Sequence, residues 1–72
     1  MKKYFEFTDR ISNKFWEINL TGSKVTIVYG RIGIKNPAAK QKKFSSNGEA
    51  KKYTEGKIRE KVNKGYVEKK PS

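Results

Sequence analysis

Residues 13–31 read NKFWEINLTGSKVTIVYGR. In the first half of this stretch, Trp16, Ile18 and Leu20 recur at every second position, which is the period of a half-buried β-strand. Gly22 lies in a short polar break and can adopt the positive φ that a tight turn requires. The residues after the break are rich in β-branched side chains, which favour extended structure. The stretch therefore predicts an antiparallel hairpin.

The segments on either side of this hairpin also favour strands. Residues 3–8 (KYFEFT) alternate with the same two-residue period. Gly33 and Asn36-Pro37 predict a loop over residues 32–39. Residues 40–45 (KQKKFS) can form a further strand, and their lysines suit the edge of a sheet because charge opposes edge-to-edge aggregation.

The period changes after residue 45. Ser46-Asn47-Gly48-Glu49 has the S-x-x-E pattern of a capping box at a helix start. Gly56 inside the helix costs about 1 kcal/mol relative to alanine, and Asn63 and Gly65 supply stop signals. The sequence thus predicts one amphipathic helix whose apolar stripe recurs every three or four residues, at Ala50, Tyr53 or Thr54, Ile58 and Val62.

Strands grouped first and a helix afterwards predict an α+β fold. We expect a small antiparallel sheet of about four strands with one C-terminal amphipathic helix packed on it. At 72 residues the chain forms a single domain with a thin core. We expect that core over about 3–68, with Tyr66-Val67 as a further candidate for pairing with the sheet, and a flexible tail over 69–72.

The charge of the chain favours a polyanionic partner. The net charge is +11, from 18 Lys and Arg against 7 Asp and Glu. The excess is +4 over residues 1–36 (seven cations, three acids) and +7 over 37–72 (eleven cations, four acids). DNA, RNA and an anionic membrane surface all fit such an excess. The alternative is a soluble protein whose lysines are only solvated.

The composition also argues against several functions. Cysteine and histidine are absent, which removes disulfides, the commonest metal ligand and the usual general base. We therefore expect no enzymatic activity, no cofactor and no metal site. No run of about 18 apolar residues exists to span a membrane, and the N-terminus lacks an apolar signal core. The expected protein is a cytoplasmic monomer, nucleoid-associated if bacterial, with no membrane partner.

The order and spacing of these segments resemble those of the WGR domain, a family named for a Trp-Gly-Arg motif. The family is found in DNA-dependent poly(ADP-ribose) polymerases and in bacterial proteins, including a proposed molybdate-metabolism regulator. The resemblance covers about residues 3–68. It rests on four segments: Asn13-Lys14-Phe15-Trp16-Glu17-Ile18, Gly22-Ser23-Lys24-Val25, Tyr29-Gly30-Arg31-Ile32-Gly33 and Lys64-Gly65-Tyr66.

The resemblance implies a small antiparallel sheet with one helix and a DNA-binding role at strand breaks. It places Tyr29 at the position of the motif Trp, which packs on a sugar near a 5′ terminus. Gly30 and Arg31 match the Gly and Arg of the motif. Asn13 matches a position associated with the DNA terminus, and Tyr66 matches an aromatic residue after the helix. Tyr29 departs from the pattern, although a tyrosine ring can still stack. The catalytic domain of the polymerases is absent, so their enzymatic activity does not carry over.

The residues themselves leave alternatives open. Tyr29 is either a stacking platform or part of the core, and Arg31 either grips phosphate or pairs with a glutamate. Asn13 either binds a phosphate or caps a turn. Trp16 is expected in the core. The candidate nucleic-acid-binding residues are Asn13, Tyr29, Gly30, Arg31, Lys35, Lys40, Lys42 and Lys43.

Three functions fit these features. The first is a DNA-binding module that reads little sequence and prefers duplex ends or nicks through a basic face around residues 29–31. The second is a protein-interaction or regulatory module of a larger protein. The third is an RNA-binding domain, because the same aromatic and basic groups stack and hold single strands.

Overall fold

Strands β2 (Asn13–Thr21) and β3 (Lys24–Arg31) form the predicted hairpin at the centre of the sheet. The turn depends on Gly22, whose φ of 62° lies in the left-handed region that favours glycine. The register pairs Trp16 with Tyr29 and Ile18 with Ile27. The large apolar residues of both strands therefore share one face of the sheet.

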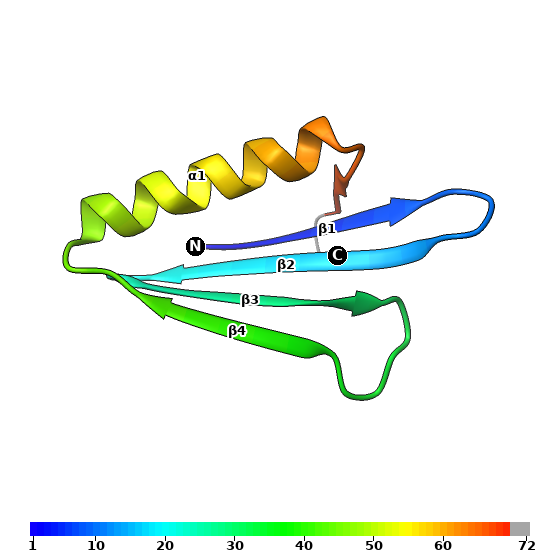
Figure 1. Cartoon of the computed structure of the whole chain (residues 1–72), viewed down its shortest axis with the longest axis horizontal. Coiled ribbons are helices and arrows are strands. Elements are labelled where there is room, and N and C mark those ends of the chain that lie inside the picture. The colour runs from blue at the N-terminus through cyan, green and yellow to red at the C-terminus, as the bar shows by residue number, and fades with distance from the viewer. Residues whose placement is uncertain (70–72) are drawn as a thin grey trace.

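The computed structural model describes residues 1–69. Its other elements are β1 (Lys2–Thr8), β4 (Ala38–Lys43), the helix α1 (Asn47–Asn63) and β5 (Val67–Glu68). The five strands form one antiparallel sheet in the order β4-β3-β2-β1-β5, and α1 runs along one face of it (Figure 1). The predicted α+β class is confirmed. Within the part of the chain that the structure describes, no helix could cross a membrane.

Two details differ from the sequence-based expectation. The sheet has five strands rather than about four, because Val67 pairs with Glu6 and Glu68 with Phe5. Strand β4 begins at Ala38, two residues before its predicted start, and ends at Lys43. The two alanines extend the ladder because nothing in their small side chains opposes pairing with the end of β3.

The C-terminal boundary lies close to the predicted one. The Lys69 N–H donates a hydrogen bond of 2.9 Å to the Tyr4 carbonyl, which ties residue 69 to β1. The expected flexible tail otherwise falls on residues 70–72, which lie outside the described residues.

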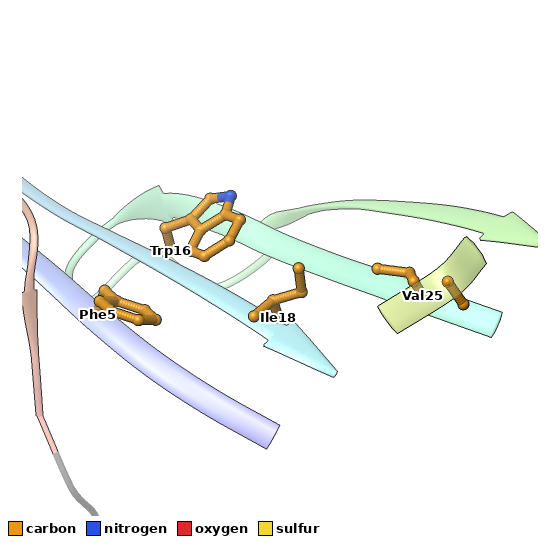
Figure 2. Close-up of a cluster of buried hydrophobic side chains, with 5 residues drawn as sticks. Phe5, Trp16, Ile18 and Val25 are labelled. Atoms are coloured by element: carbon orange, nitrogen blue, oxygen red, sulfur yellow. The ribbon is translucent and has the colours of Figure 1, made fainter. Parts of the chain in front are cut away.

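The core lies between the sheet and α1. Phe5, Trp16, Ile18 and Val25 project from β1, β2 and β3 toward this layer, as Figure 2 shows. The Phe5 and Trp16 rings pack at 5.6 Å with a tilt of 55°. Trp16 is 3% exposed, so its predicted place in the core is confirmed. The helix contributes Ala50 and Thr54 as its buried residues, and six partly buried side chains surround the cluster: Leu20, Ile27, Phe44, Tyr53, Ile58 and Tyr66.

The start of α1 follows the predicted cap in part. The Ser46 hydroxyl accepts a hydrogen bond of 3.2 Å from the Glu49 N–H, as in a capping box. The Glu49 carboxylate, however, accepts from the Ser45 hydroxyl at 2.7 Å. The helix is thus held at its N-terminus by two serines instead of by a reciprocal Ser–Glu pair.

The end of α1 is a Schellman motif. The Tyr66 N–H donates to the Lys61 carbonyl at 3.0 Å, and the Gly65 N–H donates to the Val62 carbonyl at 3.0 Å. Gly65 has φ of 105°, and a Cβ at this position would lie 3.0 Å from Cε2 of Phe7. Glycine is therefore required both for the turn and for the close approach to β1. The motif brings the Tyr66 ring beside Lys61.

Thr54 gives a direct test of core energetics. It is fully buried, and its Oγ1 has no hydrogen-bond partner among the described residues. Because an unpartnered buried hydroxyl costs about 1–3 kcal/mol, we expect Thr54→Val to raise the free energy of unfolding by roughly 1 kcal/mol in urea denaturation. Thr54→Ser keeps the hydroxyl and loses a methyl group, so it should lower this free energy by about 1 kcal/mol. Destabilisation by both variants would contradict the conclusion that the Thr54 hydroxyl is buried without a hydrogen-bond partner.

Candidate nucleic-acid interface

Alternation along the strands gathers basic and aromatic side chains on the face of the sheet that carries α1. Lys14 lies two residues before Trp16 on β2, and the register places Arg31 opposite Lys14 and Tyr29 opposite Trp16. On β4, Lys40 pairs with Ile27 and so shares this face. Tyr29 is 37% exposed and Arg31 is also exposed, so neither belongs to the core.

The second half of α1 supplies the opposite wall. Tyr53, Lys57 and Lys61 recur every four residues and therefore lie on one side of the helix. With Tyr66, held by the Schellman motif, they face the strand residues across a groove of about 440 Å³. We call this space the α1–sheet groove. Its cations are Lys14, Arg31, Lys40, Lys57 and Lys61, and its aromatic side chains are Trp16, Tyr29, Tyr53 and Tyr66.

Lysine ammonium groups lie over the rings of the groove. Lys61 Nζ is 5.6 Å from the centre of the Trp16 ring and 5.2 Å from that of Tyr66. Lys40 Nζ is 5.7 Å from the Tyr29 ring, and Lys57 Nζ is 5.7 Å from the Tyr53 ring. Each contact is a cation–π interaction, which holds the charge near the wall without neutralising it.

The groove has a large excess of positive charge. Its single acid, Glu60, lies 4.0 Å from Lys57 and 3.7 Å from Lys64. Within residues 1–69, the ion pairs leave Lys14, Arg31, Lys40 and Lys61 without a carboxylate partner. The intramolecular ion pair considered for Arg31 is therefore not formed among these residues. Four unpaired cations facing one space give the groove a strongly positive potential.

Lys61 has the most perturbed electrostatic environment of these cations. Burial lowers the pKa of Lys61, and repulsion from Lys64, Lys57 and Lys14 lowers it further, while Glu60 acts in the opposite direction. A second hollow of about 420 Å³ adjoins the groove and shares Lys14, Lys61 and Tyr66 with it. Lys61 thus stands where the two hollows meet.

Comparison with known proteins identifies the family. The WGR domain family matches residues 1–72, the whole chain. The chain belongs to the WGR domain family. It is 35% identical over 68 residues to the Escherichia coli (strain K12) protein named Uncharacterized protein YfeS, covering 94% of this chain and 28% of that protein. A crystal structure of a Bacteroides fragilis protein superposes with a TM-score of 0.92 at 44% identity, covering 97% of this chain and 20% of that one. The chain thus spans between a fifth and three tenths of the length of these relatives.

The structure separates the predicted site residues into two groups. Tyr29, Gly30, Arg31 and Lys40 line the α1–sheet groove. A Cβ at Gly30 would lie only 3.2 Å from Cγ2 of Ile34. Glycine at this position therefore lets the Ile34 side chain pack closely against β3. The remaining candidates, Asn13, Lys35, Lys42 and Lys43, lie outside its lining.

These outer residues have different surroundings. The Asn13 carbonyl accepts a hydrogen bond of 3.0 Å from the Ile32 N–H, which anchors the turn after β3. Lys42 lies over the Phe44 and Tyr53 rings, at 5.3 and 5.1 Å. Lys43 pairs with Lys24 and points to the opposite face of the sheet. Lys35 is exposed in the loop before β4.

The sequence-based interpretation missed three of the five cations in the groove of this WGR domain. These three cations are Lys14, Lys57 and Lys61. The signal was present in the spacing: Lys14 is two residues from Trp16, and Tyr53, Lys57 and Lys61 are four residues apart. Spacing alone, however, does not show that the end of α1 stands away from the sheet.

We expect Lys64→Gln to raise the pKa of Lys61 toward its ordinary value. The substitution removes a repelling charge and frees Glu60 from its ion pair, and both changes favour the charged amine. NMR titration of the Lys61 side chain measures this shift. Lys51→Gln, on the exposed side of the same helix, should leave the Lys61 pKa unchanged. An unchanged or lower value in Lys64→Gln would contradict this account.

Proposed function

We propose that this WGR domain binds DNA through the α1–sheet groove, reads little sequence and prefers duplex ends or nicks. The observation that carries the proposal is the lining of the groove, where five cations and one acid surround aromatic rings. Cations supply affinity by releasing counterions from the phosphate backbone. Exposed rings supply surfaces on which a sugar or base can stack.

The shape of the site supports a preference for interrupted DNA. The half-exposed Tyr29 ring lies inside the groove, between the sheet and the second half of α1. Inside an intact duplex the bases are paired and stacked, so they cannot present a sugar or base to such a ring. A terminal or nicked nucleotide can leave the stack at lower cost. End preference therefore follows from a ring placed inside a groove instead of on a flat surface.

The same lining supports weak sequence discrimination. None of its described members is Asn or Gln, the side chains that pair with adenine edges, and lysines dominate its cations. Lysine acts mainly as a point charge toward phosphate. The groove thus favours contacts that position the backbone over contacts that specify bases.

Salt dependence tests the location of the site. If about five phosphates are engaged, log K should fall against log salt with a slope near −4.5 in fluorescence anisotropy titrations with duplex DNA. Lys40→Gln should reduce this slope by about 0.9. Lys43→Gln removes the same charge from the same strand but on the opposite face, so it should leave the slope unchanged. Equal slopes for the two variants would place the binding surface elsewhere.

A comparison of DNA forms tests the preference for ends. A linear duplex should bind more tightly than a closed circle of equal length, and Tyr29→Ala should abolish this difference by removing about 1–3 kcal/mol of stacking. Affinity for the circle should be little affected by the substitution. Equal affinity of the wild type for both forms would defeat the end preference, and tighter binding of single-stranded RNA would favour the RNA-binding alternative.

A further inference from the structure

Lys61 differs in its contacts from the other cations of the groove. Its Nζ lies over two rings, Trp16 at 5.6 Å and Tyr66 at 5.2 Å, and forms no ion pair among residues 1–69. Trp16 is almost fully buried, so one side of the amine faces the core. The backbone around Lys61 is fixed, because its carbonyl accepts the Schellman hydrogen bond from Tyr66. The Lys61 amine thus lies against an aromatic wall.

The lowered pKa makes the neutral amine of Lys61 easier to reach than that of an isolated lysine. The charged or titratable groups near it are Lys14 on β2, Lys57, Glu60 and Lys64 on α1, Arg31 at the end of β3, and Tyr66 after the helix. Burial and the neighbouring lysines lower the pKa of Lys61, with only Glu60 opposing them. A neutral lysine amine is a nucleophile, and desolvation beside other cations is how proteins produce one. For phosphate binding alone, the same shift is a disadvantage.

We propose that the Lys61 amine reacts reversibly with an aldehyde that lies next to a phosphate group and binds it as an imine. In DNA, this aldehyde is the open-chain sugar of an abasic site. The proposal rests on the proposed function, because the groove must first bind the DNA. Lys14, Arg31, Lys40 and Lys57 then hold the flanking phosphates, which leaves Lys61 for the carbonyl carbon. An abasic sugar carries no base, so it can enter the groove without unpairing one.

The chemistry balances without a further reactant. The lone pair of neutral Nζ forms a bond to the aldehyde carbon, and the carbonyl oxygen takes up a proton as the nitrogen loses one. The hydroxyl group of the resulting carbinolamine takes up a proton and leaves as water while the nitrogen lone pair forms the C=N bond. The nitrogen then gives up its remaining proton, which leaves the neutral imine. Amine and aldehyde thus give imine and water, with no change of oxidation state. Hydrolysis reverses the capture, so the inference requires no strand cleavage.

Reductive trapping tests the inference. The protein is mixed with duplex DNA containing one abasic site at saturating concentration, and cyanoborohydride converts any imine to a stable secondary amine that denaturing electrophoresis detects. We expect Lys61→Arg, which keeps the charge but cannot form this imine, to trap about tenfold more slowly than the wild type. Lys52→Arg, on the exposed side of α1, should trap at the wild-type rate. Peptide mapping should place the adduct on Lys61.

A second arm separates this inference from the proposed function. Pyridoxal phosphate, a small aldehyde that carries its own phosphate, replaces the DNA under the same conditions. Trapping of both probes at Lys61 supports the inference and identifies DNA as one source of the aldehyde. Trapping of pyridoxal phosphate alone, in a protein that does not bind duplex, supports the lysine chemistry and refutes the DNA-binding function. DNA binding with adducts spread evenly over the lysines, or equal rates for Lys61→Arg and the wild type, overturns the inference and leaves the function standing.

Discussion

The two-residue period of β2 is the constraint on which both the core and the groove depend. It places Lys14, Trp16 and Ile18 on one face, so a single strand passes from the groove into the core over five residues. Trp16 belongs to both regions: its ring packs on Phe5 at 5.6 Å and carries the Lys61 amine at 5.6 Å. Folding of the core therefore fixes the wall of the groove, and no separate ordering of the site is needed. Such preorganisation lowers the entropic cost of binding.

The parts of the fold that follow from local rules were predictable from the sequence. Alternation in residues 13–31, a glycine turn and an S-x-x-E helix start are each determined by neighbours within a few positions, and all three are present. The short strand β5 was anticipated only as a candidate pairing of Tyr66-Val67 with the sheet, because two residues carry no periodic signal. Its pairing to β1 depends on where α1 ends, and that position is set by the cap at Gly65 and its contact with Phe7. The fifth strand therefore forms because the helix cap at Gly65 directs the chain back to β1.

The same distinction explains which site residues were predictable. Tyr29, Gly30, Arg31 and Lys40 are close in sequence to one corner, and a local pattern pointed to them; all four line the groove. Lys57 and Lys61 lie 26 and 30 positions after Arg31 in the sequence. Whether a helical lysine faces solvent or a groove depends on how the helix lies over the sheet, which propensity does not encode. Lys43 shows the opposite error: it is adjacent to Lys42 in sequence, yet alternation turns it to the other face.

Net charge alone hides how unequal the two faces of the sheet are. On the face away from α1, Tyr4 stacks on Phe15 at 5.8 Å and donates a hydrogen bond of 2.8 Å to Glu6, and Glu17 pairs with Lys2 at 3.7 Å. Burial, followed by the hydrogen bond and the charge of Glu6, raises the pKa of Tyr4 to about 12. Acids thus sit near the centre of one face, while four cations without carboxylate partners line the groove on the other. For the DNA binding proposed above, this asymmetry would orient the polyanion toward the groove before contact. Under that proposal, the relevant charge is the part that β-strand alternation places on the helical face, and a count over the whole chain does not measure it.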